Sequence, residues 1–261
     1  MAFLFYGDAS GTSDRSNVAV GGYVSTIENW EAFKPQWEAE LHKEGVDYFR
    51  RSQMEPPFHG EFAKLGWTVN HQKAVLKRLH RLIKRYTIKG VAKAVRNKAF
   101  AEMVSPKIKQ MYGGPYGWAM LLNLVDIGLW ARRRNQWVSY FFEAGDEGQG
   151  QINTAISELY DHPMTRELLR IHSWSFVPKK GPCAVVQLQS ADFIAFEAYK
   201  DIENFLVGSK RPARKSRKDL IRKGVDQLNC WADEAFSRWL VRVAECNGHV
   251  INSLITDTPN T

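Results

Sequence analysis

The first ten residues constrain the fold most, because they have the pattern of a strand that is buried on both faces. Phe3 and Phe5 alternate with Leu4 and Tyr6, and the run reaches Asp8, which small residues follow. A strand that carries a carboxylate from an apolar interior to the rim of a sheet is one way to place a metal ligand. Asp8 can also simply open the turn that follows, and this stretch alone favours the turn.

Alternating strand-like and helix-like segments follow this first strand. Strands are predicted at 18–24, 87–96, 137–143 and 171–177, and helices at 30–41, 70–86, 115–134, 146–161, 186–206 and 231–243. Gly21 and Gly22 in the second strand indicate a bulge or a close backbone approach. The order predicts an α/β fold, a mixed five-stranded sheet flanked by helices, with one domain over 1–206. A basic segment and a C-terminal helix over 207–261 are expected to pack on the same domain.

The net charge of +8 is concentrated in one segment. Between Val207 and Lys223 there are eight basic residues against Asp219 alone, so the rest of the chain is close to neutral. Such a run is either a solvated connector or a contact to phosphates, and the sequence favours neither. As a nucleic-acid contact it would use a set of six cationic side chains. These are Lys210, Arg211, Arg214, Lys215, Arg217 and Lys218.

Cysteine usage and hydropathy exclude several classes of protein. The three cysteines are far apart and form no Cys-x-x-Cys pair, which argues against a zinc ribbon or a disulfide framework. The longest apolar segment, Tyr116–Ala131, is interrupted by Asn123 and Asp126, so no membrane span is expected. No signal-peptide pattern precedes Gly7. The expected location is the cytoplasm.

Three carboxylates lie where strand ends could bring them together. Asp8 and Glu143 end the first and fourth strands, and Asp192 lies in the first turns of the helix after the fifth. Converging carboxylates repel one another unless a cation neutralises them, and oxygen ligands select Mg²⁺ or Mn²⁺ over Zn²⁺. Glu143 can equally be a plain strand end, and Asp192 can be stabilised by the helix dipole alone.

Five further residues are candidates for the same site. His59 and Glu61, two residues apart in a loop, are candidate catalytic groups, although a lone loop histidine is more often only hydrogen-bonded. Ser10, Asp146 and Gln189 are candidates for supporting roles. Gln189 lies one turn before Asp192, where its amide either orients that carboxylate or does nothing.

Four segments resemble the bacterial and phage family called domain of unknown function 3800. They are residues 6–24, which hold Tyr-Gly-Asp-Ala-Ser-Gly and Val-Gly-Gly-Tyr-Val, then Phe-His-Gly-Glu at 58–61, the acidic Gly-rich strand end at 142–150, and Leu-Gln-Ser-Ala-Asp at 188–192. The resemblance implies a ribonuclease-H-like fold with two divalent metals. Carried over residue by residue, it makes Asp8, Glu143 and Asp192 the metal ligands, with Glu61 and His59 as further members.

The resulting expectation is a metal-dependent nuclease of the cytoplasm that hydrolyses phosphodiester bonds of DNA or RNA with one or two Mg²⁺ or Mn²⁺ ions. The chain departs from the family pattern at Ala9, where members often have Glu. That departure supports a rival reading, an inactive nucleic-acid-binding protein of the same fold. A second rival is an interaction protein of a toxin or phage-defence system, with a homodimer face built from its many Trp and Phe residues.

Overall fold

A computed structural model describes residues 2–11, 16–104, 106, 109–110, 113–146, 149–206 and 213–231. At positions 61, 151, 206 and 229–231 the description covers the backbone only. The predicted helix beyond residue 231 lies outside the described residues, as do Lys210 and Arg211 of the basic segment.

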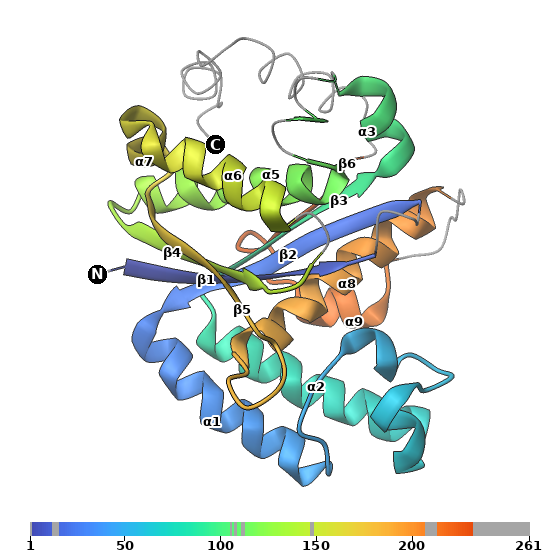
Figure 1. The fold of residues 1–261 in the computed structure, drawn as a ribbon. Coiled ribbons are helices and arrows are strands. Elements are labelled where there is room, and N and C mark those ends of the chain that lie inside the picture. The colour runs from blue at the N-terminus through green and yellow to red at the C-terminus, as the bar shows by residue number, and fades with distance from the viewer. Residues whose placement is uncertain are drawn as a thin grey trace.

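A six-stranded, mostly parallel sheet forms the centre of the molecule (Figure 1). The strands are β1 (Ala2–Ser10), β2 (Asn17–Thr26), β3 (Lys89–Arg96), β4 (Trp137–Glu143), β5 (Ile171–Val177) and β6 (Gln227–Trp231). Their order across the sheet is β5-β4-β1-β2-β3-β6, and β2 runs antiparallel to both of its neighbours. The other pairs are parallel. The α/β architecture and the five predicted strands are therefore present.

The prediction of five strands was wrong by one. Residue Trp231, expected to begin a helix, ends β6 and pairs with Val95 of β3. Trp231 and the apolar residues further along the chain have helical spacing, which predicted a helix. A strand at this position is instead stabilised by backbone hydrogen bonds to the edge of β3, more than 130 residues earlier. No local pattern reports that partner.

Helices cover both faces of the sheet (Figure 1). One face carries α1 (Ile27–Lys43), α2 (Val69–Tyr86), α8 (Gln187–Leu206), α9 (Lys215–Leu220) and the short 3₁₀ helices η1 (Arg51–Met54) and η2 (Gly60–Leu65). The other carries α3 (Asn97–Met103), α5 (Pro115–Arg132), α6 (Gln149–Asp161) and α7 (Pro163–Leu168). No helix in the described part of the chain is long and apolar enough to cross a membrane.

Strand β1 is buried between the two helical layers, as its alternation predicts. Phe5 belongs to the core under α5 and lies 5.9 Å from Phe142, ring centre to ring centre. Tyr6 points the other way, where it stacks on Phe141 at 4.9 Å and meets the edge of Trp30 at 5.2 Å. Both cores therefore hold β1 in a single register against β4.

Gly22 is required by a close backbone approach, one of the two readings that the sequence left open. It pairs with Gly7 in a ladder that runs without a bulge from Phe3 to Ser10. A Cβ atom at position 22 would lie 2.0 Å from the Tyr6 carbonyl oxygen and 2.6 Å from the Phe5 ring. Only glycine fits between these two neighbours.

Candidate metal centre at the carboxyl ends of β1 and β4

The pairing of β1 with β4 brings two carboxylates to one rim of the sheet. Gly7 pairs with Phe142 in the parallel ladder, so the next residue on each strand, Asp8 and Glu143, follows at the same level. Side chains two residues apart in a strand share a face. Because Tyr6 and Phe141 stack on the face covered by α8, Asp8 and Glu143 project to that face as well.

A third carboxylate joins them from the turn after β4. One oxygen of each of Asp8, Glu143 and Asp146 lies within 4.8 Å of the other two. The turn passes through Gly145 at φ 88°, a conformation that favours glycine, and the Gly145 N–H donates to Gln149 Oε1 at 2.8 Å. The Tyr116 hydroxyl donates to Asp146 Oδ2 at 3.0 Å. Asp146, expected to support the site, is thus part of the cluster.

A buried lysine lies between two of the carboxylates. The Lys179 Nζ atom is 2.6 Å from Asp8 Oδ2 and 2.7 Å from Glu143 Oε2, and its side chain is only 3% exposed. Lys179 was not among the residues predicted for this site, because no lysine or arginine outside the 207–223 segment was considered as a site residue. One signal was available: Lys179 comes two residues after the end of β5, which pairs with β4 through Glu143 and Val177.

The cluster shifts the pKa values of its members in different directions. Burial raises the pKa of Asp8 well above its usual range; the nearby Lys179 opposes this, and the negative charges of Asp192 and Glu143 add to it. Burial also acts to raise the pKa of Glu143, but the hydrogen bond with Asp8 and the charge of Lys179 outweigh it, so that pKa is lowered. Within this pair, Asp8 is therefore the weaker acid and Glu143 the stronger one.

Burial and neighbouring charges also shift the pKa values of Asp146 and Lys179. Burial, together with the charge of Glu143, raises the pKa of Asp146 to about 6. Burial acts to lower the pKa of Lys179, but Asp8, Asp192 and Glu143 outweigh it, and the pKa is raised well above its usual range. Lys179 is therefore a permanent cation inside an acidic cluster.

Asp192 is not a member of the acidic group that the described residues form. Its Oδ2 atom accepts a short hydrogen bond from the backbone N–H of Arg51, the first residue of η1. Asp192 acts on Asp8 and Lys179 through its charge. The predicted ligand set of Asp8, Glu143 and Asp192 stays a prediction. Among the described residues, the third carboxylate grouped with Asp8 and Glu143 is that of Asp146.

The hydrogen bonds that Gln189 accepts come from outside the cluster, and the supporting role of Ser10 stays a prediction. The Gln189 side chain is buried, and its Oε1 atom accepts hydrogen bonds from Trp37 Nε1 and from the Phe49 backbone N–H, both at 3.1 Å. It ties α1 and the following loop to α8 rather than orienting a carboxylate. Ser10 pairs with Ala19 at the end of β1 and is half-buried.

His59 does not belong to the acidic cluster either. It is exposed, it precedes η2, and its backbone N–H donates to the Gln53 carbonyl oxygen at 3.1 Å. These are the features of a loop histidine, the alternative that the sequence left open. Glu61 lies in η2, and its side chain is outside the described residues.

Two residues ahead of η1 lie close enough to the acidic cluster to interact with it electrostatically. The positive charge of the exposed Arg50 acts to lower the pKa values of Glu143 and Asp146, but its effect on each is smaller than the effects of burial and of Lys179. Burial raises the pKa of Tyr48, with Lys179, Asp192 and Glu143 also acting on it. Arg50 is therefore a solvent-accessible cation beside the carboxylates, where an anionic ligand could be bound.

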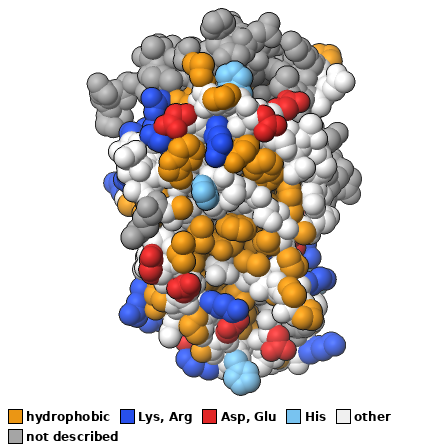
Figure 2. Space-filling model, turned by 60° about the vertical axis from the view of Figure 1, so that its left-hand side comes forward, with side chains coloured by type: hydrophobic (Ala, Val, Ile, Leu, Met, Phe, Trp, Pro, Cys, Tyr) orange, Lys and Arg blue, Asp and Glu red, His pale blue; other side chains and the backbone are white. Residues whose placement is uncertain are grey.

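Much of the described basic segment is neutralised within the chain. Arg214 pairs with Glu55 at 2.7 Å and with Glu197 at 3.1 Å, and Arg217 pairs with Asp201. Lys215 and Lys218 are exposed. The face of the molecule in Figure 2 carries acidic and basic side chains together, with hydrophobic side chains between them, and is not a basic surface.

A scan against protein-family models and a search of curated proteins find no match to this chain. The resemblance to the domain of unknown function 3800 family therefore stays a prediction.

Proposed function

We propose that this protein is a metal-dependent nuclease of ribonuclease-H-like fold that hydrolyses phosphodiester bonds of DNA or RNA. The observation that carries the proposal is the meeting of Asp8, Glu143 and Asp146 at the ends of neighbouring parallel strands. Acidic residues at the ends of the first and fourth strands of a mixed sheet are what a resemblance to the ribonuclease-H-like superfamily implies. Strand β6 lies outside that five-stranded set.

The donor set suits a hard divalent cation. All three groups offer carboxylate oxygens, which favours Mg²⁺ or Mn²⁺. With the three carboxylates and Lys179 ionised, the cluster has a net charge of minus two, which one divalent ion would neutralise. This charge balance supports one ion rather than two at this position, with Lys179 supplying the remaining positive charge.

An ion held by Asp8, Glu143 and Asp146 would lower the pKa of a bound water and stabilise the charge that develops on a phosphodiester. Lys179 donates to Asp8 and Glu143 at once and so fixes the positions of both carboxylates. The accessible guanidinium of Arg50 would bind the oxygens of the phosphate group. Tyr116 holds Asp146 toward the cluster through its hydroxyl. No role is proposed for His59.

The test is a cleavage assay with labelled single- and double-stranded DNA and RNA in Mn²⁺, in Mg²⁺ and in EDTA. We expect metal-dependent cleavage that Asp8→Asn and Glu143→Gln each reduce by at least about a hundredfold. The matched control is Asp161→Asn, which changes an exposed acidic residue at the end of α6. Metal-dependent cleavage that Asp8→Asn leaves unchanged would rule out this centre.

The position of Lys179 also favours a second candidate, a nucleic-acid-binding or interaction protein in which the cluster is structural. A buried ammonium within 2.7 Å of two carboxylates can stabilise them without any metal ion. Ala9, where the resembled family often has an acid, supports the same reading. Calorimetry with Mn²⁺ separates the two: the nuclease binds Mn²⁺ and loses that binding in Asp8→Asn, whereas the second candidate shows no binding heat.

A further inference from the structure

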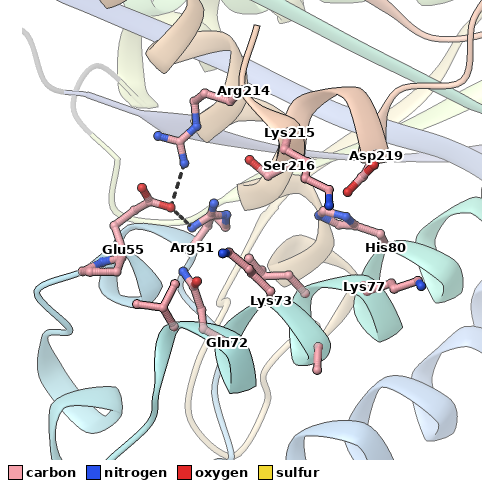
Figure 3. Close-up of a pocket in the computed structure, with 14 residues that line it drawn as sticks. Arg51, Glu55, Gln72, Lys73, Lys77, His80, Arg214, Lys215, Ser216 and Asp219 are labelled. Carbon is pink, nitrogen blue, oxygen red and sulfur yellow. Dashed lines mark hydrogen bonds and ion pairs between the residues drawn. The ribbon is translucent and has the colours of Figure 1, made fainter.

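A pocket of about 520 Å³ lies between α2, η1 and α9, apart from the acidic cluster (Figure 3). Its charged lining is mostly cationic. The cations are Arg51, Lys73, Lys77, Arg214 and Lys215, and the acids are Glu55 and Asp219. The pocket therefore has an excess of positive charge and attracts anions.

The arginines of this pocket form ion pairs with acidic residues, whereas its lysines form none within the described part of the chain. Glu55 is shared by Arg51, at 2.5 Å, and by Arg214, at 2.7 Å. In the described parts of the chain, by contrast, Lys73, Lys77 and Lys215 make no ion pair, and all three are exposed. They come from two elements, α2 and α9, and line one pocket, with the Lys73 and Lys77 side chains extending in opposite directions (Figure 3). Lysines that are free of ion pairs leave the pocket with a positive charge that favours a phosphate.

Two buried side chains that line the pocket each have a nitrogen atom without a hydrogen-bond partner among the described residues. Arg51 and His80 are 1% and 5% exposed. Arg51 Nε and His80 Nε2 have no hydrogen-bond partner among the described residues. Buried polar atoms are usually satisfied in folded proteins, and a ligand in the pocket would offer these two a partner, because both residues line it. Because burial lowers the pKa of His80 to about 3, its ring is neutral and needs a polar partner rather than an anion.

The rest of the lining is apolar except for Gln72 and Ser216. Pro56, Val69 and Leu76 line the same pocket as the three lysines, and Val69 is 45% exposed. The volume lies within the range of roughly 300–1,000 Å³ that is usual for small-molecule sites. An inorganic anion would leave most of this space and the apolar surface uncovered. A ligand that combines a phosphate with a flat, largely apolar group fits both parts.

We infer that this pocket binds a nucleoside phosphate. The phosphate group is attracted by the exposed lysines of the lining, Lys73, Lys77 and Lys215, and the nucleoside packs against Val69 and Leu76. This chemistry is shared by a free mononucleotide and by the 5′-phosphorylated end of a nucleic-acid strand. The inference does not depend on the proposed nuclease function, since none of the pocket residues belongs to the acidic cluster.

The pocket and the acidic cluster flank one segment of the chain. Arg50 acts on Glu143, whereas the side chain of the next residue, Arg51, lines the pocket. The Arg51 guanidinium pairs with Glu197 of α8 at 3.2 Å, and its backbone N–H binds Asp192 of the same helix. A ligand in the pocket therefore lies close to the segment that carries Arg50 to the cluster.

The experiment is isothermal titration calorimetry of the full chain in EDTA at low salt, so that cleavage plays no part. The probes are adenosine monophosphate, adenosine, inorganic phosphate, and decathymidylate with and without a 5′-phosphate. We expect the mononucleotide to bind at least about tenfold more tightly than either adenosine or inorganic phosphate. The double variant Lys73→Ala/Lys77→Ala should weaken that binding by at least about tenfold.

The matched control is Lys34→Ala/Lys98→Ala, which removes two exposed lysines from α1 and α3 and should leave binding unchanged. Tighter binding of 5′-phosphorylated decathymidylate than of the mononucleotide identifies a strand end as the natural ligand, and equal binding identifies a free nucleotide. The inference is overturned if the mononucleotide does not bind, or if inorganic phosphate binds as tightly as the nucleotide. It is also overturned if both double variants bind the nucleotide equally tightly. Asp8→Asn should bind the nucleotide like the unmodified protein, so failure of the nuclease proposal is distinguishable.

Discussion

The Nζ atom of Lys179 lies 2.6 Å from Oδ2 of Asp8, and both side chains are almost wholly buried. The two residues are 171 positions apart in the chain. Their pairing makes the acidic cluster compatible with a folded protein before any ion binds. It also makes Lys179 the residue whose removal should reveal most about the centre.

Lys179→Met should destabilise the protein by about 3 kcal/mol, because two buried carboxylates lose their cation. If the cluster holds a metal ion, Mn²⁺ should recover part of that loss by taking over the charge of the ammonium. Urea unfolding with and without Mn²⁺ measures both effects. Lys180→Met, a change at the exposed neighbour, should stay within about 0.5 kcal/mol of the unmodified protein. Equal stability of the two variants would contradict the structural role of Lys179.

Substitution by Met should lower folding stability at Arg51 but not at Arg50. Arg51 is buried and pairs with Glu55 and Glu197, so Arg51→Met should cost about 3 kcal/mol in urea unfolding. Arg50 is exposed beside the carboxylates, so Arg50→Met should leave stability within about 0.5 kcal/mol. On the proposed function, Arg50→Met should slow cleavage by about tenfold. Loss of stability in Arg50→Met, or none in Arg51→Met, would show that the two side chains are wrongly placed.

His80 should make folding stability depend on pH below neutrality. Burial lowers its pKa from 6.5 to about 3, so the unfolded chain binds a proton in this range that the folded protein does not. Stability therefore falls as the pH drops through 6.5, by about 2 kcal/mol between pH 8 and pH 5. His80→Gln should remove that part of the pH dependence, as measured by urea unfolding at both pH values. His42→Gln, at an exposed position of α1, is the control and should retain it.

Gly22→Ala should destabilise the protein by about 3 kcal/mol or more, because the added methyl group meets the Tyr6 carbonyl and the Phe5 ring. Thermal or urea unfolding reports the change. Gly150→Ala is the matched control, since Gly150 is exposed in the first turn of α6 and has no atom within 4 Å of the added carbon. We expect that control to be neutral or slightly stabilising. A tolerated Gly22→Ala would mean that β1 and β2 are not paired as described.

Sequence patterns predicted the parts of the site that are set by strand ends. Phe3 to Tyr6 alternate as a buried strand must, and Asp8 follows at its end; the same reasoning placed Glu143 at the end of β4. Asp146 was recognised only as a supporting residue, since the turn that swings it toward Glu143 depends on Gly145. These features are local, because strand alternation and turn chemistry act over a few residues.

Other features could not be read from local patterns. The oxygen of Asp192 is occupied by the backbone of Arg51, 141 residues away in the chain. The Oε1 atom of Gln189 likewise accepts hydrogen bonds from Trp37 and Phe49, which are distant in the chain. The pairing of β6 with β3 belongs to this group too. In each case the partner lies on another element, and its identity depends on how the helices pack against the sheet.

The sequence by itself determined the alternation of strands and helices, the α/β class, and two carboxylates delivered to strand ends. Only the tertiary structure decided that Lys179 lies between those carboxylates, that Asp146 is grouped with them, and that three lysines from α2 and α9 line one pocket. The physical reason is the distance along the chain over which each kind of interaction acts. Backbone propensity and side-chain periodicity act between near neighbours, whereas charge pairing and cavity shape arise from residues that meet only when the chain has folded.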